Sequence, residues 1–202
     1  MINDRHELNL FIKSDLMMNR GFFSWPIKQR LLHIIYPDYV MRYLWRLRKA
    51  EYYSNCCSQY SFKRLFNEAC LSRLGIKLGF SIAYNVFGYG LVIPHYGTIV
   101  VGVGNKIGNY CVLHTSTCIS AGEKKIGDAF YVSTGAKILK DIHLGDNVSV
   151  AANSVLNQSS NDSDCMFAGM PAQRVKDSEP WYKRDSKEYC RRVAECSKLW
   201  GV

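Results

Sequence analysis

The chain has 202 residues, with 26 lysines and arginines against 17 aspartates and glutamates and a formal net charge of +9. This length suits one domain with an appendage, and the absence of any long uncharged apolar run excludes a predicted transmembrane helix. The first residues include Asp4, Glu7 and Asp15 and lack the apolar core of a signal peptide, so we expect a cytoplasmic protein. The eight cysteines form no C-x-x-C pair and are interpreted as reduced, small apolar residues.

The N-terminal third carries most of the positive charge. Residues 1–79 hold 13 lysines and arginines against 6 acidic residues, whereas residues 80–175 hold 6 of each. We expect residues 1–24 to be weakly structured and residues 26–36, 38–54 and 61–74 to form three helices. Aromatic residues there lie among leucines and isoleucines at helical spacing, which favours packed amphipathic helices over a nucleic-acid surface. Contact of this basic segment with a membrane surface or an anionic ligand stays open.

From about residue 80 an aliphatic residue recurs at every sixth position. The longest unbroken series is Ile126, Val132, Ile138, Leu144, Val150 and Leu156. Neither a helix nor an ordinary strand has this period, but a short strand and a turn repeated every six residues does. Three such repeats make a triangular turn whose aliphatic residues stack inward, roughly 4.8 Å apart. The sequence therefore predicts a parallel β-helix over 80–157, and it disfavours a β-sandwich, whose turns are spaced more widely.

After the repeats, residues 158–202 are predicted to form a closing loop and a short C-terminal helix. A polar stretch, residues 158–164, is typical of a turn. The partly apolar segment from Trp181 to Trp200 predicts the helix. The expected organisation is thus a helical segment over 1–79, the β-helix domain over 80–157 and the closing part over 158–202.

Residues 80–176 resemble the hexapeptide-repeat acyltransferases of the left-handed β-helix class. Within that class they are most similar to serine acetyltransferases and their relatives in surface-polysaccharide clusters. The resemblance is carried by I-P-H-Y-G-T-I-V-V-G at 93–102, by the coils from Ile107 onward and by A-G-M-P-A at 168–172. It implies a left-handed coil, a homotrimer, acetyl-CoA as the acyl donor and an active site in the groove between neighbouring coils. The handedness follows from the resemblance alone, since most crossovers between parallel strands are right-handed.

His95 matches the histidine that serves as the general base in this family. Acyl transfer to an alcohol requires removal of the hydroxyl proton, and histidine exchanges protons near neutral pH. His114 falls one residue before the position above His95, so both are expected at one corner of the prism. His114 would bind the acceptor, orient His95 or hold the thioester carbonyl. Ordinary structural histidines are the alternative for both.

His143 lies on a different face and is interpreted as a surface residue, and no metal site is expected. The aspartate that family members carry about fifteen residues before the catalytic histidine is absent here, where the chain reads Phe80-Ser81. If another carboxylate orients His95, Glu123 and Asp128 are the candidates.

The family register also assigns a CoA-binding edge. It carries over onto Thr134, Ala152 and Asn157, which are expected to line one outer edge of successive coils. Small residues there let the pantetheine arm lie against the backbone as an added strand would. Arg174 and Lys176, after the turn at Pro171, are expected to meet the nucleotide phosphates.

The sequence thus predicts an acetyl-CoA-dependent O-acetyltransferase that acts on a hydroxyl group. The preferred acceptor is a sugar in capsule or lipopolysaccharide assembly, because the N-terminal third does not resemble the longer helical domain of serine acetyltransferases. L-serine is the alternative acceptor. A non-catalytic β-helix scaffold is the competing class, and the histidine in its motif argues against it.

Overall fold

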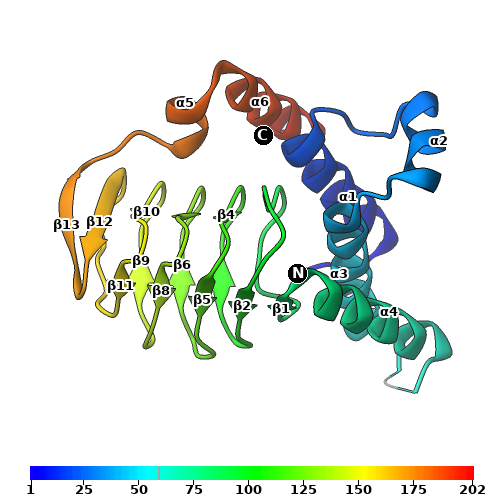
Figure 1. Ribbon diagram of the computed structural model, residues 1–202, viewed down its shortest axis with the longest axis horizontal. Helices are drawn as coiled ribbons and strands as arrows, with labels where there is room; N and C mark the ends of the chain where they lie inside the picture. The colour runs from blue at the N-terminus through cyan, green and yellow to red at the C-terminus, as the bar shows by residue number, and fades with distance from the viewer. Residues whose placement is uncertain (59) are drawn as a thin grey trace.

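The computed structural model describes residues 1–58 and 60–202 as a helical head followed by a triangular coil (Figure 1). The head consists of α1 (Arg5–Arg20), α2 (Ile27–Ile35), α3 (Tyr39–Cys56) and α4 (Phe62–Leu78). The strands are β1 (Phe80–Ile82), β2 (Ile99–Val101), β3 (Lys106–Ile107), β4 (Val112–Leu113), β5 (Thr117–Ile119), β6 (Lys125–Ile126), β7 (Tyr131–Val132), β8 (Lys137–Ile138), β9 (His143–Leu144), β10 (Ser149–Val150), β11 (Val155–Leu156), β12 (Cys165–Gly169) and β13 (Ala172–Asp177). Two helices, α5 (Trp181–Asp185) and α6 (Lys187–Trp200), end the chain.

The strands form three sheets that are the sides of a prism. The first sheet has the order β1-β2-β5-β8-β11, the second β3-β6-β9, and the third β13-β12-β10-β7-β4. Neighbours are parallel except β12 and β13, which form an antiparallel hairpin where the sequence predicted a loop. All six aliphatic residues of the long series are at most 6% exposed, as the repeat predicts. The predicted left-handed parallel β-helix is confirmed.

Side chains hold the corners of the prism together. At the corner between the second and third sheets, the backbone N–H of Asp128 donates to Asp146 Oδ1 at 2.7 Å, and that of Asn109 donates to Asp128 Oδ1 at 2.7 Å. Gly127 must lack a side chain there, because a Cβ would lie 2.1 Å from Asp146 Oδ1. These bonds give the backbone N–H groups of Asp128 and Asn109 a partner and hold each turn on the next.

The first 24 residues are not weakly structured, so that prediction is wrong. Asp4 caps α1, because its side chain accepts from the N–H of Glu7 at 2.8 Å. The carboxylate of Glu7 accepts in return from the N–H of Asn3 at 2.7 Å, one residue before the N-cap N–H that a standard capping box uses. Gly21, with φ of 84°, ends α1. Helix α1 buries Phe11 and Leu16 among other apolar residues, and this tertiary packing stabilises it.

A buried ion group ties the head to the first coil. The Arg48 guanidinium of α3 binds Asp15 of α1 at 2.7 Å and Glu51 at 3.0 Å, and all three side chains are at most 3% exposed. Arg48 also donates to the carbonyls of Phe87 and Gly88, at 3.0 and 2.6 Å. Burial, opposed only in part by Arg48, raises the pKa of the Asp15 and Glu51 carboxyls.

The C-terminal segment forms two helices rather than one and returns along the third sheet toward α1 (Figure 1). Trp181 is 1% exposed, and its Nε1 donates to the carbonyl of Tyr110 at 2.9 Å, which anchors α5 to the coil. Trp200 Nε1 donates to Ser14 Oγ at 2.9 Å, which anchors α6 to α1. Among the described residues, no helix is long and apolar enough to cross a membrane.

Candidate functional site

The strand register brings His95 and His114 to one corner of the prism. Val92 is bridged to Val112, an offset of 20 residues, whereas Ile99 pairs with Thr117, an offset of 18. His95 and His114 lie between these two pairs, on neighbouring turns of the coil. Both histidines thus lie where the chain passes from the third sheet to the first. We call this edge, residues 94–98, 114–117, 133–136 and 151–154, the histidine corner. The side chain of His95 is exposed and that of His114 is half-buried.

The His114 imidazole packs beside an aromatic ring of the next turn. Its centroid lies 5.1 Å from that of Tyr131, with an interplanar angle of 55°. Burial lowers the pKa of His114, and the neighbouring His95 lowers it further, while Asp185 acts in the opposite direction. At neutral pH His114 is therefore an uncharged imidazole with one donor and one acceptor nitrogen.

Helix α5 adds two charged residues to this corner that the sequence analysis did not identify. The Arg184 guanidinium lies over the Tyr131 ring, with Cζ 4.6 Å from its centroid. Arg184 Nη1 donates to Ser149 Oγ at 3.4 Å, and Nε donates to Asp185 Oδ1 at 2.8 Å. No local sequence pattern indicates this placement, because it depends on the long-range contact of Trp181 with the coil.

The two carboxylates suggested for orienting His95 lie elsewhere, so that suggestion is wrong. Asp128 belongs to the corner between the second and third sheets, where it binds the N–H of Asn109. Glu123 lies in the loop after β5, where its N–H donates to Asp141 Oδ1 at 2.7 Å. Asp185 is the carboxylate whose charge acts on the imidazole of His114.

The three residues assigned to one CoA-binding edge occupy two different corners. Because Val112 pairs with Tyr131 and Tyr131 with Ser149, Thr134 and Ala152 follow Thr115 in the histidine corner. Both are exposed. Asn157 instead follows β11, at the far end of the first sheet, so the prediction of a single edge is wrong for Asn157.

Arg174 and Lys176 are both exposed on β13. Arg174 is paired with Asp177 and lies 3.4 Å from Asp162, and its hydrogen bond to Asp177 raises its pKa. Its charge is therefore already partly neutralised. Contact of either residue with a nucleotide phosphate stays a prediction.

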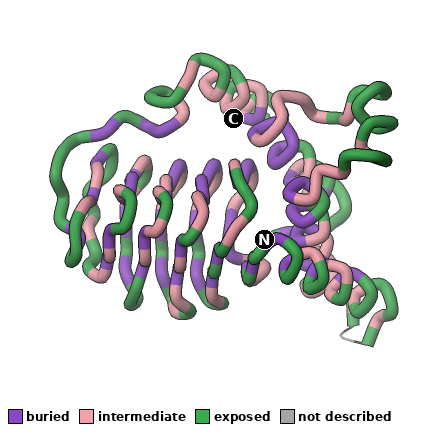
Figure 2. Tube along the Cα trace, viewed as in Figure 1, coloured by how far each residue is buried: buried purple, intermediate pink, exposed green. Residues whose placement is uncertain are grey.

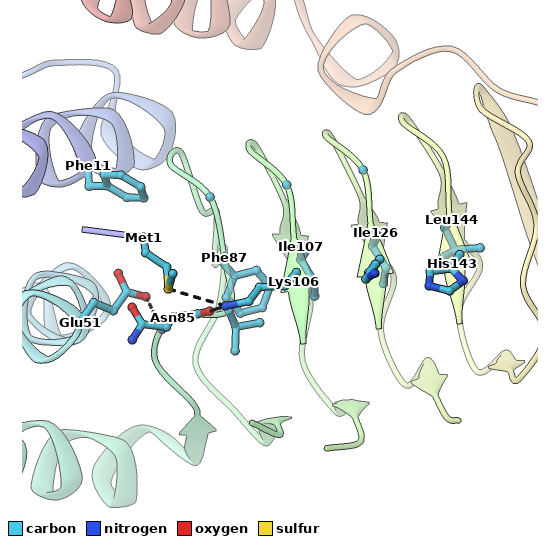
Figure 3. A pocket seen from close by; sticks show the side chains of 15 residues that line it. Met1, Phe11, Glu51, Asn85, Phe87, Lys106, Ile107, Ile126, His143 and Leu144 are labelled. Atoms are coloured by element: carbon cyan, nitrogen blue, oxygen red, sulfur yellow. Dashed lines mark hydrogen bonds between the residues drawn. The ribbon is translucent and has the colours of Figure 1, made fainter. Parts of the chain in front are cut away.

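A separate cavity of about 560 Å³ opens on the second sheet, away from the histidine corner. Figure 3 shows Lys106 on β3 and His143 on β9 lining this cavity, and Lys125 on the strand between them, β6, is in register with both. His143 is exposed, as expected for a surface residue. Within residues 1–58 and 60–202, no three histidine, cysteine or acidic side chains are grouped to hold a metal ion.

The chain is similar to serine acetyltransferases in sequence and in fold. No protein-family model matches the sequence. The chain is 30% identical over 95 residues to a serine acetyltransferase of Synechococcus elongatus, a match that covers 44% of this chain and 38% of that protein.

Among solved structures, soybean serine acetyltransferase complexed with serine matches with a TM-score of 0.63 and 21% identity, over 83% of this chain and 69% of that chain. A serine acetyltransferase in complex with CoA matches with a TM-score of 0.55 and 18% identity, over 83% of this chain and 68% of that chain. At these identities the structural matches show the hexapeptide-repeat fold. The sequence match spans well under half of the cyanobacterial enzyme.

Proposed function

We propose that the protein is an acetyl-CoA-dependent O-acetyltransferase in which His95 is the general base. The observation that carries this proposal is the exposed His95 at a coil corner beside His114, in a chain similar to serine acetyltransferases. The acceptor oxygen attacks the thioester carbonyl carbon while His95 removes the hydroxyl proton. The tetrahedral intermediate then expels the CoA thiolate, which takes the proton from His95, so no acetylated enzyme forms.

His114 is proposed to hold a substrate oxygen by a hydrogen bond. Its lowered pKa keeps the imidazole neutral, so that one nitrogen donates while the other accepts. A neutral donor stabilises an oxygen that gains negative charge in the transition state. The two histidines then have different roles: the exposed His95 removes the proton, and the half-buried His114 binds the substrate oxygen.

The comparisons favour L-serine, the alternative acceptor, over the sugar that the sequence analysis preferred. Both the sequence relative and the soybean structure are serine acetyltransferases, and nothing among the comparisons supports a polysaccharide substrate. We therefore propose L-serine as the acceptor. Its carboxylate requires a cation near the histidine corner.

Arg184 is proposed to bind that carboxylate. The coil residues 80–157 contain no arginine, so α5 supplies the guanidinium that shares the Tyr131 ring with His114. Its Nε and Nη1 bind Asp185 and Ser149, while Nη2 has no hydrogen-bond partner among the described residues. A planar guanidinium fixed on an aromatic ring suits paired hydrogen bonds to a carboxylate.

For the donor, we propose that the pantetheine arm of acetyl-CoA runs along the histidine corner past Thr134 and Ala152. Their small, exposed side chains leave the backbone accessible to an extended ligand. Arg174 and Lys176 remain the candidates for the nucleotide phosphates. A homotrimer, in which the neighbouring subunit closes the groove over this edge, completes the proposal.

The test is the release of CoA thiol by the purified protein with acetyl-CoA and a panel of acceptors that includes L-serine and neutral hexoses. We expect turnover with L-serine and a loss of about 10²–10⁴-fold in His95→Ala. Val103→Ala, at an exposed position of another corner, is the matched control and should retain full activity. Unchanged turnover in His95→Ala would refute the base assignment, and faster turnover of a hexose would restore the sugar acceptor.

A further inference from the structure

Helix α2 presents its apolar face to solvent. None of its nine residues is buried (Figure 2). The exposed large apolar residues of this helix and its C-terminal end are Ile27 (77%), Leu31 (63%), Leu32 (54%), Ile34 (77%), Ile35 (72%) and Tyr36 (72%). The spacing of Ile27, Leu31, Ile34 and Ile35 places them on one side of a helix, so they form a continuous stripe.

The polar side of α2 faces the protein instead. The His33 ring lies 4.2 Å from the Trp25 ring, and the His33 carbonyl accepts from Arg42 Nη2 at 3.2 Å. His33 lines a cavity of about 460 Å³ between α2 and the helices α1 and α3, whereas Arg30, which also borders this cavity, is exposed to solvent. A surface helix normally turns its apolar stripe toward the core, so the orientation of α2 is reversed.

The surroundings of the stripe are basic. Residues 22–37 contain no aspartate or glutamate, and Lys28 and Arg30 are exposed on α2 itself. On α3, Arg42 continues this charge, and Asp38, the acidic residue nearest in sequence, is already paired with Arg20 at 2.6 Å. Further along α3, Lys49 Nζ lies 3.7 Å from the Trp45 ring centroid. Cations thus lie on α2 beside the apolar stripe and continue along α3.

We propose that α2 docks on an anionic phospholipid membrane and lies in the plane of its interface. The isoleucine and leucine stripe enters the boundary of the acyl chains, and Lys28 and Arg30 meet the headgroups. Tyr36, which is 72% exposed, stands at the C-terminal end of the helix, and tyrosine is enriched at membrane interfaces because its ring is apolar and its hydroxyl is polar.

A second copy of the chain fits this surface less well. In a twofold contact both copies use the same patch, so Lys28, Arg30 and Arg42 of one copy would lie against a patch that carries the same three cations. A stable protein interface also uses about 20–30 residues on each side. The apolar stripe of α2 offers four side chains, and an anionic lipid surface complements both the stripe and the basic residues beside it.

The proposal is tested by vesicle flotation of the full chain. The probes are vesicles of phosphatidylcholine alone and vesicles in which phosphatidylglycerol replaces part of it, each at low and at high salt. We expect binding to the anionic vesicles that weakens at high salt, since salt screens exposed charges. Lys28→Gln with Arg30→Gln should weaken this binding about 30-fold, from about one factor of five for each cation.

A second variant tests the stripe itself. Leu31→Ser with Ile34→Ser and Ile35→Ser should weaken vesicle binding at least about 100-fold. The matched control is Val103→Ser with Val175→Ser, which changes exposed apolar residues of the coil and should bind like the original protein. Because the changed side chains are exposed, thermal unfolding should be similar in all variants, and a variant that unfolds earlier is replaced by the single Ile34→Ser.

Three results would overturn the proposal. The first is equal binding to neutral and anionic vesicles, and the second is undiminished vesicle binding by the stripe variant. The third is that the original protein binds no vesicles but forms a dimer in light scattering, and that the stripe variant does not form this dimer. CoA release in solution is measured separately, so the membrane proposal can fail while the proposed enzymatic function stands, and the reverse.

Discussion

Replacement of Arg184 by glutamine should remove the preference for acceptors that carry a carboxylate. The guanidinium lies 4.6 Å above the Tyr131 ring, and its side chain is 32% exposed. A hydrogen bond to a charged group contributes about 1.5–3 kcal/mol, and solvent at a site this open reduces that to about 1–2 kcal/mol. The expected loss in kcat/KM for L-serine is therefore about 5–30-fold.

The assay compares L-serine with L-serinamide, which keeps the hydroxyl and amino groups but has no carboxylate. Arg184→Gln should lower kcat/KM for L-serine and leave that for L-serinamide nearly unchanged. Lys183→Gln removes a neighbouring exposed cation of the same helix and is the matched control. An equal loss for both acceptors would show that Arg184 acts on the structure of the corner, and no loss for either would refute the assignment.

Two further predictions concern stability. The pKa of His114 is lowered from an ordinary value of 6.5, so just below that pH the unfolded chain binds more protons at this site than the folded one. The free energy of unfolding should thus decrease as the pH drops through this window. Urea titrations should find a smaller decrease in unfolding free energy for His114→Gln than for the original protein, and an equal decrease would contradict the pKa shift. Arg48→Met leaves Asp15 and Glu51 buried without a cation and should lower the unfolding free energy by about 3–5 kcal/mol, which a triple variant with Asp15→Asn and Glu51→Gln should partly restore. A loss below about 1 kcal/mol would mean that water reaches these carboxylates.

The coil was predictable because its signal is local and repeated. Each inward aliphatic residue follows from its own hexapeptide, and the six agreeing positions from Ile126 to Leu156 leave little freedom in the register. The same spacing shows why the prediction that Asn157 shares an edge with Thr134 and Ala152 is wrong. Thr134 and Ala152 are 18 residues apart and share a corner, whereas Asn157 follows Ala152 by only five and must lie one side of the prism further on.

The sequence of α1 contains helix-capping residues that would have predicted this helix. Asp4 and Glu7 have the spacing of a capping box, and Gly21 marks the end of the helix. The role of α5 had no comparable signal. Its five residues were predicted only as the start of one longer helix, and Arg184 reaches Tyr131 because Trp181 is anchored 71 positions away in the sequence, at Tyr110. Contacts of that range depend on the assembled fold.

The helical head also has a direct bearing on the turn that carries His95. The first coil has no complete turn before it, so part of its backbone would end as an open edge of unpaired N–H and C=O groups. Asn19 of α1 closes this edge, because its Nδ2 donates to the Leu91 carbonyl at 2.8 Å and its Oδ1 accepts from the N–H of Ile93 at 3.1 Å. Asp15 accepts from the N–H of Leu91 at 2.9 Å in the same way. These bonds end two residues before His95, so the head fixes the segment that carries the proposed general base. We therefore expect that loosening α1 lowers activity before the coil itself unfolds.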